Sequence, residues 1–173
     1  MKLFPNKSWS GVRAQSAFLI NMTILAGACA PRAHPPIVSI QTSPETVTLS
    51  RNDKGVTFTL TSVIRNEGPG PLYLFPCGPD LNRLIGDSWV SVWTAPCALS
   101  SPLTQIDPGD SLTLPVRVVA YSDPASFPRL DPRLTAGQYR LVWDLAYRDD
   151  PAGPTVSLPG KKRVSSIFSL REP

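Results

Sequence analysis

Few residues in this chain of 173 could perform acid–base or nucleophilic chemistry. The single histidine, His34, lies in a polar, proline-rich segment near the N-terminus. A Ser-His-Asp or Cys-His site needs a histidine as general base on the folded domain, and none follows His34. A serine–lysine site would have to use Lys54, Lys161 or Lys162, which occupy predicted turns where the burial that activates a lysine is not expected. The sequence therefore disfavours hydrolysis by a catalytic triad.

Two pairs of aspartates could offer oxygen ligands to a calcium ion, Asp107 with Asp110 and Asp149 with Asp150. Neither pair has the acidic spacing of a dedicated calcium loop, and aspartate is common in turns because its side chain bonds to the nearby backbone. The chain also lacks a glycine-rich phosphate-binding loop followed by a lysine and a helix. We therefore expect neither a metal site nor a cofactor. A hydrolase that uses carboxylates alone is the least favoured class of function.

The first 28 residues are typical of an export signal. Lys2, Lys7 and Arg13 precede an apolar segment of 12 residues, 17–28, which is too short to span a bilayer as a helix and ends in small residues. Removing this signal leaves 14 basic and 13 acidic residues, so the net charge falls from +4 to about +1. Lys161, Lys162 and Arg163 are then the only run of cations, and a nucleic-acid partner is not expected.

The segment Leu25-Ala-Gly-Ala-Cys29 resembles the lipobox of bacterial lipoproteins. The resemblance implies cleavage before Cys29, a lipid on that cysteine and anchorage to a membrane of the bacterial cell envelope, on its periplasmic or outer face. The family prefers leucine three residues before the cysteine, where this chain has Ala26. Two alternatives therefore stay open, an unlipidated secreted protein and an uncleaved anchor. Residues 29–44 are predicted to be a proline-rich tether, and the folded domain to span residues 45–173.

Beyond Cys29 the chain has two further cysteines, Cys77 and Cys97. Both follow the export signal, and disulfides form in the oxidising compartments that such signals lead to. We predict a disulfide between them. It would close a loop of about 20 residues and stabilise the fold by on the order of 3 kcal/mol in the chain-entropy model.

Strict two-residue alternation is the strongest structural signal, and it occurs in two segments. In residues 134–147 one row of a predicted strand holds Tyr139, Leu141, Trp143, Leu145 and Tyr147. In residues 56–66 one row is Val56, Phe58, Leu60, Ser62 and Ile64, and the other is rich in threonine. Both patterns predict strands with one face in a core.

Shorter apolar runs at residues 47–50, 72–75, 89–94, 111–119 and 164–170 bring the expected number of strands to about seven. Twenty prolines and eleven glycines indicate many turns and few helices. Pro115, inside one of these runs, indicates an edge strand or a bulge. Residues 121–134 are predicted to be a long loop that either has a function or covers an open sheet edge. The fold class is therefore all-β, a two-sheet sandwich.

A proline–glycine turn at residues 107–110 opens one strand, and Gly137-Gln-Tyr139 starts another. These motifs resemble the late part of bacterial immunoglobulin-like domains, over about residues 45–170, and BsuPI-type proteinase-inhibitor domains are among the candidates. The resemblance implies an immunoglobulin-like β-sandwich. It also makes Tyr139 a candidate for a tyrosine corner, in which the hydroxyl bonds to the backbone upstream. A plain core tyrosine is the alternative.

Trp89 and Trp93 share one face of the strand predicted at residues 89–94. If that face is exposed, the two rings together with the disulfide loop, residues 80–88, form the predicted partner-binding surface; the alternative is that both rings lie in the core. The favoured function is a non-enzymatic cell-envelope lipoprotein whose β-sandwich binds or supports another envelope component or a secreted protein. The alternative is a proteinase inhibitor that inserts residues 121–134 into an enzyme cleft.

Overall fold

The structure is a computed structural model that describes residues 36–97, 102–148 and 152–173. The chain divides into two compact units, residues 1–31 and 32–173, and every described residue belongs to the second unit. The predicted signal peptide, the lipid site at Cys29, His34 and the pair Asp149 and Asp150 lie outside the described residues. No helix within the described ranges has both the length and the apolar run needed to cross a membrane.

The described unit consists of β-strands in three hydrogen-bonded sheets, with one short 3₁₀ turn at Gly160–Lys162. In the first sheet β4 (Gly55–Asn66) is central, with β1 (Val38–Ser43) and β3 (Ser50–Asn52) on one side and β9 (Ser111–Tyr121) on the other. The second sheet has the order β2 (Thr46–Thr48), β13 (Phe168–Arg171), β10 (Gly137–Val142), β6 (Asp80–Ile85), β7 (Ser88–Thr94). The third has the order β12 (Val156–Ser157), β11 (Leu145–Tyr147), β5 (Leu72–Leu74), β8 (Thr104–Ile106).

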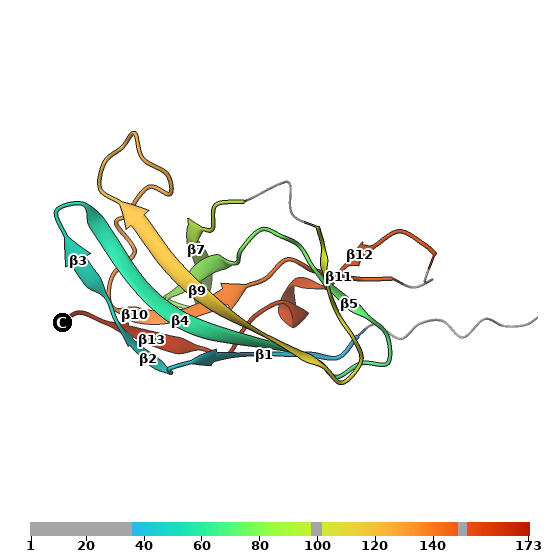
Figure 1. The fold of residues 1–173 in the computed structure, drawn as a ribbon. Coiled ribbons are helices and arrows are strands. Elements are labelled where there is room, and N and C mark those ends of the chain that lie inside the picture. The colour runs from blue at the N-terminus through green and yellow to red at the C-terminus, as the bar shows by residue number, and fades with distance from the viewer. Residues whose placement is uncertain (1–35, 98–101, 149–151) are drawn as a thin grey trace, which may run out of the picture. The chain divides into compact units, whose positions relative to one another are not determined.

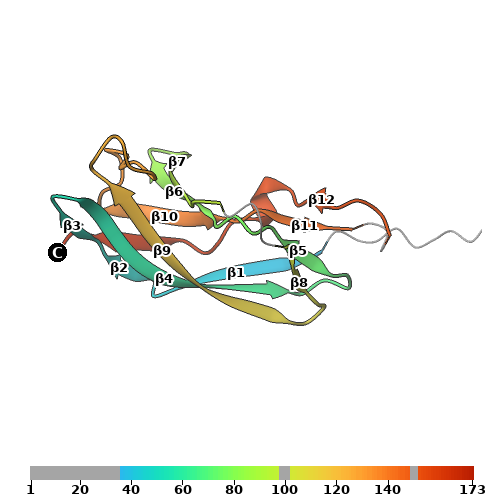
Figure 2. The ribbon, with the colours of Figure 1, turned by 45° about the horizontal axis from the view of Figure 1, so that its top comes forward.

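The second and third sheets continue one another along the chain, because β5 leads into β6 and β10 leads into β11. The strand predicted over residues 134–147 is thus divided at Trp143 and Asp144. At these two residues the backbone hydrogen bonds lie outside the strand ladders. The Trp143 N–H donates to the carbonyl of Arg163 (2.8 Å), and the Phe75 N–H donates to the carbonyl of Asp144 (3.1 Å). Figure 2 shows β1 and β4 on one side and β6, β7 and β10 on the other.

The core lies between these layers, and its composition follows the two alternating rows. The row of β4 faces it, with Phe58 and Leu60 nearly inaccessible to solvent. The opposite layer contributes Tyr139, Leu141 and Phe168. Large apolar side chains on facing layers exclude water from each other, which is the main force that holds such a sandwich together. The prediction of an all-β sandwich is confirmed.

Two segments that the sequence placed outside strands are strands. The predicted tether extended to residue 44, but β1 pairs with β4 from Val38 to Ser43, so the domain begins earlier. The segment 80–88 was predicted to be a surface loop, but β6 is an interior strand between β10 and β7. The sequence did not predict β6 because its centre is polar. The partners of Arg83 in this strand lie far away in the sequence. The Arg83 guanidinium donates to the carbonyls of Arg133 (2.7 Å) and Ala136 (2.9 Å).

Candidate functional site

A cleft with a volume of about 380 Å³ opens between β9 and the bend at residues 75–79, which joins β5 to β6. Its lining is largely apolar and includes the rings of Trp93 and Trp143 and the side chains of Leu74, Leu114 and Val116. Such concave apolar surfaces are where proteins commonly hold ligands. Sequence patterns did not reveal this cleft, because its walls come from segments that lie far apart in the chain.

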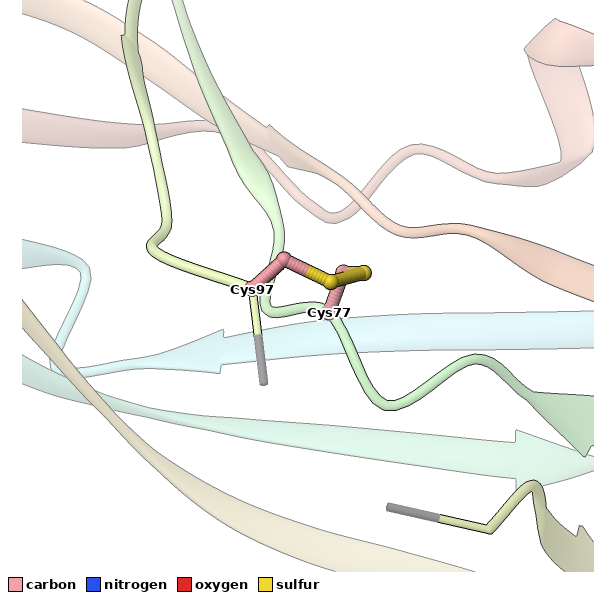
Figure 3. Close-up of a disulfide and its surroundings, with 2 residues drawn as sticks. All are labelled: Cys77 and Cys97. Carbon is pink, nitrogen blue, oxygen red and sulfur yellow. A yellow bond between two sulfur atoms is a disulfide. The ribbon is translucent and has the colours of Figure 1, made fainter. Parts of the chain in front are cut away.

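A disulfide between Cys77 and Cys97 holds one wall of the cleft, as predicted. The two Cα atoms are 4.4 Å apart, and the two cysteines also form an isolated backbone bridge. Figure 3 shows that the bond joins the bend before β6 to the chain that follows β7. Next to it, a side chain on Gly78 would put its Cβ 2.6 Å from the Cβ of Ala95, so glycine is required where these segments approach.

Trp89 and Trp93 do not share a face, which corrects the prediction from alternation. Leu81 of β6 pairs with Trp93 but Asn82 pairs with Ser91, so β7 carries one extra residue, Val92. This β-bulge reverses the alternation between the two tryptophans. Trp93 turns inward, with 6% of its surface exposed, and its indole N–H donates to the carbonyl of Val119 (2.8 Å). Trp93 is therefore a core residue that also lines the cleft.

Trp89 lies half-buried on the other face of the same layer. The guanidinium of Arg140 stacks over its ring, 4.3 Å from the ring centroid. Partial burial against this ring lowers the pKa of the Arg140 guanidinium. The Trp89 ring and the disulfide therefore lie on separate surfaces, and the composite surface expected from the sequence is divided into two.

The strand β9 forms an edge of its sheet, as Pro115 predicted, because β4 is its only strand partner among the described residues. Alternate residues of an antiparallel edge strand direct their N–H and C=O groups away from the neighbouring strand. In β9 these are the odd-numbered residues, since Val119 accepts from Trp93 and both backbone groups of Tyr121 bond to residues 128 and 130. Pro115, which has no N–H, occupies one of these outward positions without losing a ladder bond.

Two polar groups at the cleft have no partner among the described residues. The indole N–H of Trp143 is buried and makes no hydrogen bond, although the residue is only 4% exposed. Arg117 lines the cleft from β9, is exposed, and belongs to none of the ion pairs found in the described ranges. A buried donor without an acceptor is unfavourable by about 1–3 kcal/mol.

The loop at residues 121–134 covers the far end of the β9 edge. The Tyr121 N–H donates to the carbonyl of Pro128 (2.9 Å), and the Leu130 N–H donates to the carbonyl of Tyr121 (2.8 Å). Figure 1 shows this loop rising from the end of β9. Phe127, with 69% of its surface exposed, is the most exposed large apolar side chain of the described residues. The prediction that this loop covers an open edge is confirmed for this part of β9.

Two carboxylates brace that loop internally. Asp123 accepts from the Ala125 N–H (3.0 Å) and the Ser126 hydroxyl (2.9 Å), and the backbone bond is the main reason why its pKa is lowered. Asp131 forms a two-pronged ion pair with Arg133, whose side-chain hydrogen bonds lower the pKa of that carboxyl. Both acids therefore fix the loop's own conformation rather than face a common substrate site.

Tyr139 forms the tyrosine corner that the resemblance implied. Its hydroxyl donates to the carbonyl of Thr135 (2.5 Å) and accepts from the Thr135 N–H (3.1 Å), four residues upstream. Burial is the main cause of the raised pKa of this phenol. The hydroxyl is thus occupied in fixing the start of β10, and Tyr139 has a structural role.

The remaining candidate groups for chemistry lie apart from the cleft. Asp107 accepts from the side-chain amide of Gln105 (2.7 Å), and its carbonyl accepts from the Asp110 N–H (3.0 Å), as expected of turn residues. In the part of the chain that the structure describes, no three His, Cys, Asp or Glu side chains are grouped so as to hold a metal ion. Lys161 and Lys162 belong to the 3₁₀ turn, and Lys54 is exposed.

No family model matches the chain, and no curated protein matches it in sequence. Solved structures that the chain matches include a Bordetella pertussis protein described as ApaA (12% identity, 82% of this chain and 98% of that chain, TM-score 0.45). The CARDB domain of a Pyrococcus furiosus protein has 14% identity over 79% of this chain and 94% of that chain, with a TM-score of 0.33.

The ASH/PapD-like domain of human CEP192 has 14% identity over 97% of this chain and 96% of that chain, with a TM-score of 0.31. The strand order and the shared core of this chain make it an all-β sandwich. None of the comparisons supports the resemblance to BsuPI-type inhibitor domains.

Proposed function

We propose that this protein is a non-enzymatic lipoprotein of the bacterial cell envelope, anchored through Cys29, whose sandwich binds an apolar part of another envelope component. The binding site is the cleft between β9 and the bend at residues 75–79. The observation that supports this proposal is the cleft itself, which has two tryptophan rings in its lining and a disulfide in its wall. A wall held by a covalent bond loses less conformational freedom on binding, so more of the contact energy appears as affinity.

The composition of the cleft favours binding over catalysis. Among the residues that the structure describes, Arg117 is the only lining residue with an ionisable side chain, because Cys77 is in the disulfide and no described acid or lysine lines the cleft. General acid–base catalysis needs a group that gains and loses a proton near neutral pH, and an arginine remains charged there. A pocket with apolar walls and a cation at its strand edge suits recognition of a ligand.

Two substitutions on β8 test the proposal as a matched pair. Thr104 and Gln105 are adjacent and exposed, but only Thr104 lines the cleft. Thr104→Trp is expected to fill the cleft and to abolish capture of a partner from the envelope fraction, whereas Gln105→Trp adds the same ring elsewhere and is expected to retain it. Equal capture by both variants, with both shown by circular dichroism to be folded, would remove the cleft from the proposal.

A proteinase inhibitor acting through residues 121–134 is the second candidate function. The observation that favours it is Phe127, exposed in this loop, since an inhibitor must present a side chain to an enzyme pocket. The loop's internal bonds to Asp123 and Asp131 give it a fixed shape, which also lowers the entropic loss on binding. A panel of proteases incubated with the purified protein tests this function. Inhibition that is lost in Phe127→Gly is expected if the function is correct, and cleavage of the loop without inhibition contradicts it.

A further inference from the structure

We infer that the cleft binds an extended polypeptide segment, which adds as a new strand to the β9 edge at residues 113–117 and alternates apolar with acidic side chains. The inference rests on the proposed binding function and specifies the chemistry of the partner. In this arrangement apolar side chains of the segment enter the cleft, and acidic side chains face Arg117 on the outer face of the sheet.

The backbone of β9 offers unused hydrogen-bonding groups over this stretch. The backbone N–H and C=O groups of the odd-numbered residues point away from β4. Near the end of the strand, the carbonyl of Val119 bonds to Trp93, and both backbone groups of Tyr121 bond to the loop that follows. At Thr113, Pro115 and Arg117 the outward groups meet no described partner. An unpaired strand edge of this kind is the surface to which extended peptides add by main-chain hydrogen bonds.

Pro115 makes this edge better suited to a foreign strand than to a second copy of itself. It removes one donor from the middle of the stretch, so the usable groups are the N–H and C=O of Thr113 and Arg117 and the C=O of Pro115. A second copy of the same edge would lack a donor as well, and edge prolines are a known device against such self-pairing. A foreign segment with all its N–H groups keeps the bonds on both sides of the proline.

The side chains along the β9 edge determine which positions of the added segment should be apolar and which acidic. Four β9 residues line the cleft, and of these Leu114 and Val116 turn their side chains to the inner face of the sheet. Arg117 reaches the cleft at the strand edge, and its exposed side chain lies with that of Thr113 on the outer face. A strand added to β9 continues this pattern, since its side chains also alternate between the two faces. Residues next to Leu114 and Val116 therefore contact apolar walls, and those on the outer face lie beside an exposed cation.

Charge complementarity selects acidic residues for that outer face. Arg117 forms no ion pair with any described residue, and Arg65 lies one strand away on the same outer face, opposite Ser111. Opposite charges on neighbouring strands attract each other, and like charges there are unfavourable. A segment with glutamate or aspartate at alternate positions therefore fits this edge better than one with lysine.

The test uses a synthetic peptide of about seven residues, the length of a typical strand, that alternates valine with glutamate and has blocked ends. Binding to the purified full chain is followed by calorimetry and by tryptophan fluorescence, to which Trp93 and Trp143 in the cleft contribute together with Trp9 and Trp89. The controls are a peptide of the same composition in scrambled order, one with lysine in place of glutamate, and one whose edge-facing amides are N-methylated.

Two variants of the protein identify the edge. Thr113→Pro removes one outward N–H without removing a bond to β4, and is expected to weaken the alternating peptide at least about fivefold. Arg117→Glu is expected to weaken the glutamate peptide about tenfold and to strengthen the lysine peptide. Arg65→Glu, which makes the same charge change one strand further from the edge, is expected to have a much smaller effect.

The outcomes distinguish a failure of strand addition from a failure of the proposed binding site. Binding of the alternating peptide that Thr113→Pro and Arg117→Glu both weaken supports strand addition. If the N-methylated or scrambled peptide binds equally well, or if neither variant changes affinity, strand addition is wrong. If no peptide binds but partner capture still depends on Thr104, then the cleft is the site and its ligand is of another class. If capture is also independent of Thr104, the proposed function is wrong as well.

Discussion

The indole N–H of Trp93 donates a 2.8 Å hydrogen bond to the carbonyl of Val119, and this bond joins the edge strands of the two layers. Trp93 belongs to β7, at the edge of the second sheet, and Val119 to β9, at the edge of the first. The ring thus closes the sandwich at one point along its open side. On one side of it lies the loop at residues 121–134, and on the other lies the cleft.

Trp93→Phe is expected to destabilise the protein by about 1–2 kcal/mol, because it keeps most of the buried ring but leaves the Val119 carbonyl without a donor. Trp89→Phe is the matched control, which removes the same atoms from a ring that contacts Arg140 and is expected to lower stability by about 0.5–1 kcal/mol at most. The midpoint of urea unfolding measures both. Equal shifts for the two variants would show that the bond between the edges contributes nothing.

The disulfide is expected to contribute about 3 kcal/mol to the free energy of unfolding, because it closes a loop with a sequence separation of 20 residues. Alkylation of the unreduced protein should label neither Cys77 nor Cys97. Cys77→Ala with Cys97→Ala together should lower the unfolding midpoint and weaken binding in the cleft, whose wall they release. Ready labelling of both thiols in the native protein contradicts the bridge.

The Asn66 side chain bonds the end of β4 to two neighbouring segments of backbone. Asn66→Asp is expected to lower the free energy of unfolding by about 3 kcal/mol or more at neutral pH. The Asn66 amide donates to the carbonyls of Gly70 (2.8 Å) and Ile106 (2.9 Å), whereas a carboxylate repels both. Asn52→Asp is the matched control. The Asn52 amide oxygen only accepts, from the N–H groups of Lys54 and Gly55, so this change is expected to be nearly neutral. Urea unfolding of both variants checks this.

Stability is expected to fall in alkaline solution through Tyr139. Burial raises its pKa in the folded state above the value of about 10 that a tyrosine has in an unfolded chain. The folded protein therefore holds this proton more tightly, and the resulting stability is complete below about pH 10 and is lost as the pH rises through the folded pKa. Tyr139→Phe should be less stable near neutral pH yet show a shallower alkaline decline. Identical pH profiles of unfolding would contradict this.

Lipid attachment at Cys29 is tested by the intact, unreduced mass of the protein from the membrane fraction of its host. We expect a mass that corresponds to cleavage before Cys29 with a lipid adduct, and we expect Cys29→Ser to be released from the membrane without the adduct. Cleavage at the same bond without lipid, together with soluble recovery, would favour the secreted alternative. A mass that retains residues 1–28 would indicate an uncleaved anchor.

The sequence by itself determined the parts of the fold that depend on local chemistry. The rows of β4 and of β10 with β11 follow from alternation, because the pleat of a strand sends successive side chains to opposite faces whatever lies beside it. Pro115 marked an edge because a missing N–H is a property of the residue. The pairing of Cys77 with Cys97 followed from their number and compartment.

Tertiary structure alone decided which groups meet. The interior position of β6 comes from its pairing with β10 and β7, and its Arg83 bonds to carbonyls, at Arg133 and Ala136, some 50 residues away. The inward turn of Trp93 depends on one extra residue in β7 relative to its partner, and a bulge is a relation between two strands. The cleft combines β9, the bend at residues 75–79 and the turn at Trp143. Alternation describes a strand's own two faces, so it carries no information about which distant segment completes a binding site.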